Sequence, residues 1–423
     1  MTNIIEVLRE RGLLEDMTSP ELSERVESPC VVYAGFDPTA ESLQVGNLVT
    51  IMMLAHFQRC GHRVIALVGG ATGSIGDPSG KSAERPLLSH EQIETNAAGI
   101  RENLARFLDF DHPEIPAKIV NNLDWMKDYS FIDFLRDVGK HFRMGTMLGK
   151  ESVRSRLDSD EGMSFCEFSY QLLQGYDFLH LFDKESCNIQ IGGSDQWGNI
   201  IAGTDLIHKL RGEQGFGITS PLITDRNGQK LGKSEGRAVF LSAAKTSCYE
   251  FYQYFMNIDD ADVIGLLKVF TFLSLEEIGS IETEMAAEPH KRLAQKTLAE
   301  HLTRHVHGDE GLESALKASQ VLFGGSLEGC DAAELMQIFS DVPSAELEKA
   351  SVLDQPVLDV AVAAGVCKSK GEGRRLIDNG GLYLNNVRVE DLARSVGSED
   401  LVDASVLILR SGKKKYTLVK VDA

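Results

Sequence analysis

The first half of the chain alternates short apolar runs with amphipathic stretches. Val31–Ala34 and Val64–Val68 are continuous apolar runs of strand length, and apolar residues recur at helical spacing between Leu48 and Cys60. Gly61 follows that stretch, as expected at the end of a helix. A strand, a helix and a second strand in this order predict a βαβ unit and therefore a parallel sheet.

The same pattern recurs further along the first half. Lys118–Asn121 and Asn188–Gly193 predict two more strands, and a helix is expected from about Ser194. We therefore expect an α/β, Rossmann-like domain with a parallel sheet over residues 1–225. Ligands of such sheets bind at the carboxyl ends of the strands, so the Gly and Asp residues that close these strands are site candidates.

The pattern becomes helical in the second half and mixed near the end. Between Thr246 and Phe323 apolar residues recur at helical spacing, whereas the last part predicts two short helices, a strand at Leu382–Leu384 and a hairpin turn at Asn385–Asn386. The expected organisation after the α/β domain is an α-helical domain over 226–325, a linker over 326–352 and a small α+β domain over 353–423.

Length and composition agree with a multidomain globular protein. A chain of 423 residues exceeds the roughly 150 residues of an average domain, and 43% hydrophobic with 25% charged residues is ordinary. We expect no membrane span, because no apolar run reaches about 18 residues, and a cytoplasmic location, because the N-terminus lacks an apolar signal core. Seven Cys without a Cys-x-x-Cys pair argue against a disulfide framework and a zinc site, so no tightly bound metal is expected.

The net charge of −20 is unevenly distributed. Residues 361–423 contain 11 Lys and Arg against 8 Asp and Glu, a mildly basic end on an acidic body. An RNA-binding appendage would show such a bias, and so would chance, because three charges are few. Charge alone does not decide between them.

The loop from Phe36 to Asn47 joins the first predicted strand to the first predicted helix. Gly46 at the helix start lets a ligand approach the backbone, and a helix N-terminus favours an anion such as phosphate. Gln44 and Asn47 lie three residues apart and both carry side-chain donors. The alternative is a polar cap on a surface helix.

A second candidate is the stretch Gln229–Ser234, which follows an Asn-Gly turn. Lys230 and Lys233 lie three residues apart around a glycine, so both can reach a polyphosphate and stabilise charge on leaving pyrophosphate. The alternative is a solvated hairpin tip.

Two further stretches place polar side chains near predicted strands and helices. Gly69–Lys81 follows a strand but lacks the endings of a P-loop and of a dinucleotide-binding loop, so neither a P-loop kinase nor a dehydrogenase is supported. Within it, Asp77 is suited to an ammonium group or to starting a turn at Pro78. Tyr170, Gln174 and Asp177 share one helix face, which is either solvated or lines a polar pocket.

Together and in this order, these stretches resemble the signatures of bacterial tyrosyl-tRNA synthetases, a class I aminoacyl-tRNA synthetase family. The resemblance covers nearly the whole chain and rests on Gly35–Thr39, Gly69–Pro78, Ser169–Asp177 and Gly192–Asn199, while Lys230–Ser234 is similar to the KMSKS loop. It implies a tyrosine–tRNA ligase that makes tyrosyl-adenylate and pyrophosphate from L-tyrosine and ATP and then loads tRNA(Tyr). The resemblance also implies a homodimer, and it implies no binding to DNA or to a membrane.

The resemblance also implies roles for individual residues. The phenol of tyrosine would be bound by Tyr33 and Asp177, and its ammonium group by Asp77, Tyr170 and Gln174. The ATP and adenylate contacts would be Gly35, Asp37, Thr39, Gly46, Gly193, Asp195, Gln196 and Lys233. The catalytic groups around the phosphates would be Gln44, Asn47, Lys81, Arg85, Lys230 and Lys233. The end of the chain looks like an S4 RNA-binding domain in which Lys368, Lys370, Arg374 and Arg375 face phosphates.

One motif departs from the family pattern. The signature that usually reads HIGH is Gln44-Val45-Gly46-Asn47 here. Both amides keep a donor, but the reach of Gln differs from that of His, which bears on the efficiency of adenylate formation and not on the fold. The alternative that this departure raises is a catalytically weakened paralogue that binds tyrosine and RNA as a regulatory protein. A tryptophan enzyme is a further alternative, against which the Tyr33 and Asp177 pair argues.

The implied reaction needs positioning and charge stabilisation more than covalent catalysis. The substrate carboxylate is already ionised and attacks the α-phosphorus of ATP, so mobile lysines that close on pyrophosphate suffice. Mg²⁺ would arrive with ATP, held mainly by phosphates and water. A site that hydrogen-bonds a hydroxyl rejects the analogue that lacks it, and this family is itself the established example, at about 10⁵-fold against phenylalanine.

Overall fold

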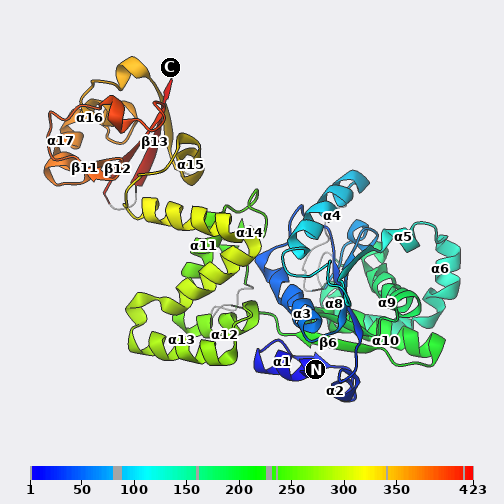
Figure 1. Ribbon diagram of the computed structural model, residues 1–423. Helices are drawn as coiled ribbons and strands as arrows, with labels where there is room; N and C mark the ends of the chain where they lie inside the picture. The colour runs from blue at the N-terminus through cyan, green and yellow to red at the C-terminus, as the bar shows by residue number, and fades with distance from the viewer. Residues whose placement is uncertain are drawn as a thin grey trace. The chain divides into compact units, whose positions relative to one another are not determined.

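The apolar runs of the first half form the strands of one sheet (Figure 1). The computed structural model describes residues 2–79, 88–158, 162–224, 231–234, 237–339, 342–412 and 415–422, and its contacts divide the chain into two units, Met1–Asp309 and Glu310–Ala423. The predicted strands of the first unit are present as β2 (Val31–Phe36), β3 (Arg63–Val68), β4 (Lys118–Asn121) and β5 (Ile189–Gly193). The sheet also contains β1 (Asp16–Met17) and β6 (Phe216–Ser220), which we did not predict.

The strand order is β1-β6-β5-β2-β3-β4. All neighbours are parallel except β1, which runs antiparallel to β6 at the edge, so the predicted parallel sheet is confirmed. The chain builds outward from β2 through β3 and β4 on one side, and through β5 and β6 on the other. The winding direction therefore reverses between β2 and β5, and such a switch point opens a crevice at the carboxyl ends of the two strands.

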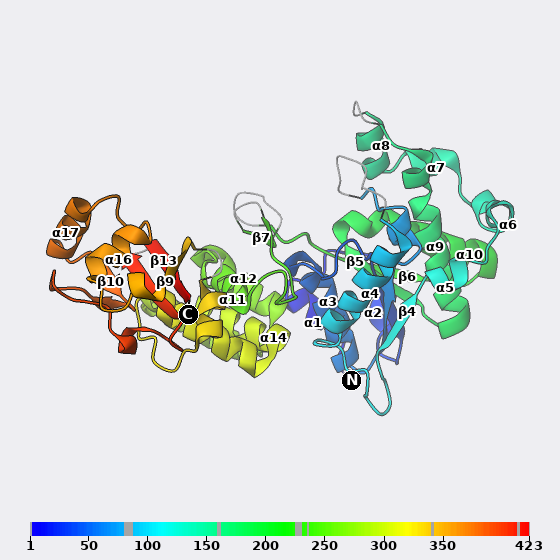
Figure 2. The same ribbon diagram turned by 90° about the horizontal axis from the view of Figure 1, so that it is seen from above.

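Helices cover both faces of this sheet. The predicted helix after β2 is α3 (Leu48–Arg59), which is buried nearly all round, as expected for a helix enclosed between the sheet and other helices. On the face that carries Tyr33 and Leu67, α9 (Phe165–Glu185) and α10 (Trp197–Arg211) supply Phe178 and Leu206 to a common core. Figures 1 and 2 show α9 and α10 side by side.

The remaining elements of the first unit are mainly helices. They are α1 (Ile4–Glu10), α2 (Leu22–Arg25), α4 (His90–Leu104), α5 (Leu123–Met126), α6 (Phe131–Asp137), α7 (Met144–Leu148), α8 (Glu151–Leu157), α11 (Cys248–Met256), α12 (Asp260–Phe270), α13 (Leu275–Ala287) and the first part of α14 (Leu293–Leu322), with the short strands β7 (Lys233–Ser234) and β8 (Arg237–Ala238). The predicted helical pattern after Thr246 is confirmed. Within the described residues, no helix is both long and apolar enough to cross a bilayer.

Gly308 interrupts α14 with a left-handed φ of 78°, next to the boundary between the two units. The second unit contains a five-stranded sheet in the order β11-β10-β12-β13-β9. Its strands are β9 (Ser344–Glu348), β10 (Leu382–Leu384), β11 (Val387–Arg388), β12 (Val406–Ser411) and β13 (Lys415–Asp422), and its helices after α14 are α15 (Ala332–Ile338), α16 (Val357–Ala363) and α17 (Lys370–Asp378).

The hairpin predicted in the second unit is confirmed. Asn385 and Asn386 join β10 to β11 with φ values of 49° and 63°, the two successive positive values that a two-residue hairpin turn requires. Strand β9 was not predicted and pairs in parallel with β13.

Candidate active site

A cavity of about 480 Å³ lies at the carboxyl ends of β2 and β5, where the winding of the sheet reverses. Its wall contains residues from both strand ends, from α9 and from the loops at residues 44–47 and 231–233. The predicted site residues that line it are Tyr33, Gly35, Asp37, Thr39, Gln44, Gly46, Asn47, Asp77, Tyr170, Gln174, Asp177, Gly193, Asp195, Gln196 and Lys233. Lys81, Arg85 and Lys230 lie outside the described residues.

A carboxyl group is buried in this cavity wall. Asp177 on α9 is 2% exposed, and its two oxygens accept hydrogen bonds from Asn122 Nδ2 and Trp125 Nε1, both at 2.9 Å. Burial raises the pKa of Asp177 to about 7, and the two donors oppose that rise because they stabilise the ionised form. The group is therefore poised between a neutral acid and a carboxylate near neutral pH.

Tyr33 on β2 presents a second buried polar group to the same cavity. Its ring packs on Phe178 at a centroid distance of 5.3 Å, and its hydroxyl, which is buried, has no hydrogen-bond partner among the described residues. Burial and the nearby charge of Asp177 raise the pKa of Tyr33, so the hydroxyl keeps its proton. A buried hydroxyl without a partner is costly, and a polar ligand would satisfy it.

A polar network lies beside this pair. Gln196 Nε2 donates to Asp77 Oδ2 at 2.7 Å, and Ser79 N donates to Asp77 Oδ1 at 2.9 Å. Asn199 Nδ2 donates to Gln174 Oε1 at 2.9 Å, and Gln174 Nε2 donates to Gln196 Oε1 at 3.2 Å. Asp77 and Gln174, which were expected to bind one ammonium group, are therefore connected through Gln196.

Tyr170 is bound to a different carboxylate from the one we grouped it with. Its hydroxyl donates to Asp37 Oδ2 at 2.8 Å, while Thr72 Oγ1 donates to Asp37 Oδ1 at 2.7 Å. Asn122 Nδ2 also donates to Thr72 Oγ1 at 3.0 Å, so the Asp177 and Asp37 networks are continuous. Asp77 is nonetheless close enough to raise the pKa of Tyr170, although burial and Asp37 have larger effects.

The loops at 44–47 and 231–233 form the other end of the cavity. Gln44 N donates to Asn47 Oδ1 at 2.9 Å, which occupies the acceptor end of that amide and leaves its Nδ2 donor as the group it can offer an anion. Gly232, with a φ of 97°, lies against Gly46, and a Cβ on Gly232 would come 3.0 Å from Gly46 N. Lys233, whose side chain is exposed, places a cation on the wall next to this contact.

Several polar residues of the site were missed in the sequence. Asn122 directly follows β4, so the rule that ligands bind at strand ends would have found it. Gln190 is a polar residue within the apolar run of β5, is 2% exposed and lines the cavity, and its position in a buried strand was a usable signal. Thr72, Ser79 and Asn199 lie within the stretches Gly69–Lys81 and Gly192–Asn199 but were not singled out there, whereas Trp125 carries no comparable local signal.

The four cations predicted to contact RNA lie together in the second unit. Lys368 precedes α17, and Lys370, Arg374 and Arg375 lie in its first two turns with exposed side chains. Lys370 Nζ forms an ion pair with Asp359 at 2.7 Å, and Arg375 Nε donates to the carbonyl of Gly371 at 3.3 Å. The helix therefore presents a small basic surface.

Comparison with protein families identifies the class. A family described as "tRNA synthetases class I (W and Y)" matches residues 25–324, and one described as "Tyrosine--tRNA ligase SYY-like C-terminal domain" matches residues 334–419. The parallel sheet with a cavity at its switch point is thus that of a class I tRNA synthetase of the tryptophan and tyrosine group.

Comparison with individual relatives distinguishes the tyrosine family from the tryptophan family. The chain is 51% identical to the tyrosine–tRNA ligase of Protochlamydia amoebophila over 422 residues, covering 100% of this chain and 99% of that one. It is 49% identical to that of Geobacillus stearothermophilus over 421 residues, covering 99% of both. A C-terminally truncated mitochondrial tyrosyl-tRNA synthetase from Aspergillus nidulans matches with a TM-score of 0.68 at 32% identity, covering 76% of this chain and 94% of that one. The chain belongs to the tyrosine–tRNA ligase family, which confirms the resemblance, the fold class and the activity expected from the sequence.

The pKa of Asp177 leads to a testable prediction. The side chain should be ionised above about pH 7 and protonated below it, because burial opposes the charge more than Asn122 and Trp125 support it. Trp125 Nε1 contacts the titrating group, so its fluorescence in a Trp197→Phe background should change with a midpoint near pH 7. Asn122→Ala should move the midpoint upward, because a donor to the carboxylate is removed.

His180 stacks on Trp125 with a ring-centroid distance of 4.3 Å, so His180→Gln is included in every protein compared. Asp177→Asn in that background is the control and should abolish the transition. A midpoint near 4 in the parent protein, or a transition that survives in the control, would contradict the assignment.

Proposed function

We propose that this cavity activates L-tyrosine with ATP, with the phenol bound by Tyr33 and Asp177. The observation that carries this proposal is the pair of buried polar groups in the wall, a carboxyl held by two donors and a hydroxyl without a partner among the described residues. A phenol can donate to Asp177 and accept from Tyr33, which satisfies both. Phenylalanine offers neither bond, so the Tyr33 hydroxyl would stay without a partner in a buried place and Asp177 would keep only its bonds from Asn122 and Trp125.

The ammonium group of tyrosine is proposed to bind at Asp77, Tyr170 and Gln174. The network around Asp77 supports this role, because Ser79 and Gln196 hold its carboxylate in place while leaving it on the cavity wall. Tyr170 and Gln174 lie one turn apart on α9, and Asp177 follows on the same face. Residues of the same helix would thus bind both the ammonium group and the phenol of one tyrosine.

ATP is the co-substrate that class I synthetases use, and we propose that it occupies the cavity between the ends of β2 and β5. Gly35, Asp37, Thr39, Gly193, Asp195 and Gln196 would contact the adenylate. Gly46 would let the phosphates approach the backbone, and Gln44 and Asn47 would donate to them. Pyrophosphate would be neutralised by Lys230 and Lys233, with Lys81 and Arg85.

Mg²⁺ would enter as part of the ATP complex, bound by phosphates and water. Among the described residues, no cluster of His, Cys, Asp and Glu is arranged to hold a metal.

For the whole chain we propose that each domain has its own function. Residues 1–225 would carry the activation chemistry, 226–325 a helical domain of the anticodon-binding type, and 353–423 an S4-like RNA-binding domain. Residues 326–352 would connect the last two and also supply α15 and β9 to the second unit. The family match over residues 334–419 and the basic surface of α17 support an RNA contact in the second unit. We propose that it works in the cytoplasm on tRNA(Tyr).

Tyrosine-dependent exchange of pyrophosphate into ATP tests the proposed activation. We expect exchange with tyrosine but not with phenylalanine or tryptophan. Asp177→Ala should lower kcat/KM for tyrosine about 10- to 100-fold, the effect of removing one or two hydrogen bonds to a buried charged group. Asp183→Asn, an exposed position on the same helix, is the control and should change nothing.

An enzyme that binds tyrosine but exchanges with no amino acid would support the weakened-paralogue alternative. Wild-type kcat/KM in Asp177→Ala would refute the role of this residue.

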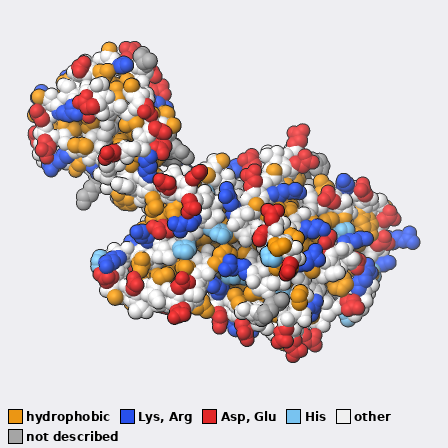
Figure 3. All heavy atoms as spheres, viewed as in Figure 1, with side chains coloured by type: hydrophobic (Ala, Val, Ile, Leu, Met, Phe, Trp, Pro, Cys, Tyr) orange, Lys and Arg blue, Asp and Glu red, His pale blue; other side chains and the backbone are white. Residues whose placement is uncertain are grey.

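The α17 surface gives a separate prediction. The face of the second unit visible in Figure 3 carries both acidic and basic side chains, so the RNA contact should depend on a few placed cations and not on a broad positive field. Neutralising Arg374 and Arg375 to Gln should reduce the slope of log affinity for tRNA against log salt by about 1 for each phosphate that is no longer neutralised. Pyrophosphate exchange should be unaffected.

The matched control is neutralisation of Lys349, which directly follows the edge strand β9, and of Lys420 on the neighbouring strand β13. If both double variants change the salt slope equally, the assignment of the RNA-binding surface to α17 is wrong.

We also propose that the enzyme is a homodimer that pairs through α6, α7 and α8. Figure 2 shows these helices along one side of the first unit. They and the start of α9 expose large apolar side chains, which monomeric surfaces rarely gather in one place. The side chains are Phe131, Ile132, Leu135, Met144, Leu148, Leu157 and Phe165, with Phe131 62% and Ile132 68% exposed.

Sedimentation at micromolar concentration tests the dimer. Wild-type protein should sediment as a dimer, and Phe131→Asp with Ile132→Asp should produce monomers, because two charges cannot be buried unpaired in an apolar interface. Leu275→Asp, which alters an exposed leucine on α13, should leave the dimer intact. A monomeric wild type, or a dimer that tolerates both aspartates, would exclude this surface.

A further inference from the structure

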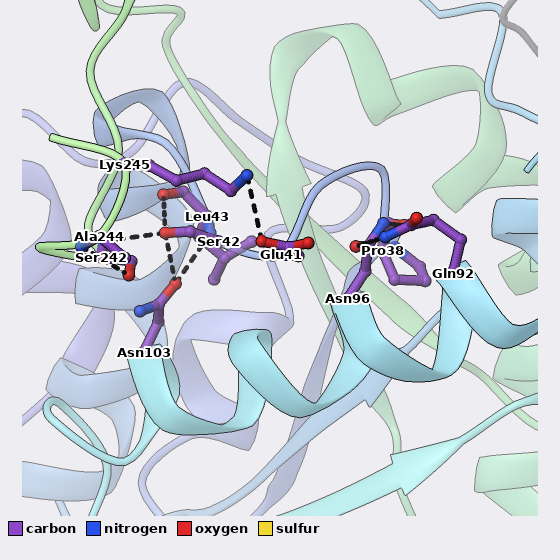
Figure 4. A network of polar contacts seen from close by, with 10 residues as sticks. All are labelled: Pro38, Glu41, Ser42, Leu43, Gln92, Asn96, Asn103, Ser242, Ala244 and Lys245. Atoms are coloured by element: carbon purple, nitrogen blue, oxygen red, sulfur yellow. Dashed lines mark hydrogen bonds and ion pairs between the residues drawn. The ribbon is translucent and has the colours of Figure 1, made fainter.

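Helix α4 carries two neighbouring stripes of residues that face the protein, in which every member is buried except the partly exposed Gly99. Ile93, Ala97, Ile100 and Leu104 are apolar and recur at helical spacing, as expected for a helix that packs on the core. Asn96, Gly99 and Asn103 form a second stripe, at positions i, i+3 and i+7 of the same helix. This second stripe contacts the loop of residues 38–43, which leads from Asp37 to Gln44 in the cavity wall (Figure 4).

The first two contacts of this stripe are with the loop backbone. Asn96 Nδ2 donates to the carbonyl of Pro38 at 2.8 Å, and Gln92 Nε2 donates to Asn96 Oδ1 at 3.0 Å, which fixes the orientation of the amide. At Gly99 the helix meets the loop with no side chain between them. A Cβ on Gly99 would come 1.8 Å from the carbonyl oxygen of Glu41, a distance that only movement of the helix or loop would relieve.

Asn103 makes the third contact with the loop. Its Oδ1 accepts from Leu43 N at 2.8 Å and from Ser42 Oγ at 3.0 Å. Ser42 Oγ in turn accepts from Ser242 N at 2.9 Å. Ser42 and Asn103 are both buried, so these groups have no access to water as a substitute partner.

Ser242 belongs to the segment that follows the Lys233 loop, and that segment pairs with the loop before Asn47. Leu241 N donates to Leu43 O, and Val45 N donates to Val239 O, both at 2.9 Å. Val239 N then donates to the carbonyl of Gly232 at 2.8 Å. The two segments that we propose to contact the phosphates are therefore joined by backbone hydrogen bonds, and α4 supports the joint from one side.

We propose that the stripe Asn96, Gly99 and Asn103 is a positioning element for adenylate formation. It sets the place of residues 38–43 and, through Ser42, the relative position of the Gln44–Asn47 and Lys233 segments. None of the three residues lines the cavity. The inference rests on the proposed function, because it assigns these residues to the phosphate end of the same site and not to its tyrosine end.

Gly99→Ala tests this positioning role, with Gly265→Ala as its matched control. Both glycines are inside helices, so alanine favours the helix equally in each, but a Cβ on Gly265 meets nothing within 4 Å. Gly99→Ala should lower kcat for tyrosine-dependent pyrophosphate exchange about 100-fold, the cost of misplacing reacting groups by about 1 Å. Its dissociation constant for tyrosine should stay within about twofold of wild type, since Tyr33 and Asp177 lie elsewhere in the cavity. Gly265→Ala should match wild type in both.

Asn103 supplies a second, independent comparison. Only its Oδ1 accepts from the loop, so Asn103→Asp keeps the acceptor while Asn103→Leu removes it at similar volume. We expect Asn103→Leu to lose exchange activity with tyrosine binding retained, and Asn103→Asp to restore most of it.

Three outcomes would overturn the proposal: exchange in Gly99→Ala equal to that in Gly265→Ala, a parallel loss of tyrosine binding and exchange, or equal activity in the two Asn103 variants. Absence of exchange in the wild-type enzyme would instead refute the proposed function, so the two failures are distinguishable.

Discussion

The burial of one carboxyl group at the end of a parallel sheet is the constraint on which this structure most depends. Asp177 is enclosed in the cavity wall, where an unpaired charge would be costly, and Asn122 and Trp125 are placed to offset that cost. Both donors come from the β4–α5 region, so that part of the chain has to dock on α9 before the group can ionise near neutral pH. A residue so constrained is well suited to discriminate between ligands, because a ligand that offers it no donor leaves the remaining cost of its burial unrelieved.

The topology explains why the rest of the site gathers around this group. Winding reverses between β2 and β5, so the residues after both strands meet at one crevice, and α9 crosses beside it with Tyr170, Gln174 and Asp177 on one face. The phosphate end has a different origin. There two loops far apart in sequence are joined by backbone hydrogen bonds around residues 43–45 and 239–241. An amino-acid end built on β2 and α9 and a phosphate end made of loops suit a reaction in which pyrophosphate must be held and then released.

Much of this was predictable from the sequence because it rests on local pattern. The apolar runs of β2 to β5 and the glycines after them indicate buried parallel strands, and the motifs around Asp37, Asp77 and Asp177 were recognisable in order. What was missed depends on tertiary approach. Trp125 donates to Asp177 only because α5 lies against α9. Strand β9 has no apolar run and is a strand only because it pairs with β13. Gly99 cannot carry a side chain without movement only because the backbone of Glu41 lies against it. The pattern of residues along one sequence does not predict such contacts between distant segments.

The most direct test of the central claim is the preference for tyrosine over phenylalanine, measured as the ratio of kcat/KM in pyrophosphate exchange, in wild-type enzyme and in Asp177→Asn. If the carboxylate forms a hydrogen bond with the substrate hydroxyl, the effect of Asp177→Asn and the effect of removing that hydroxyl are coupled. The ratio of kcat/KM for tyrosine to that for phenylalanine should then fall at least about tenfold in the variant. An unchanged ratio, with activity reduced equally for both amino acids, would show that Asp177 supports the fold of the site without recognising the phenol.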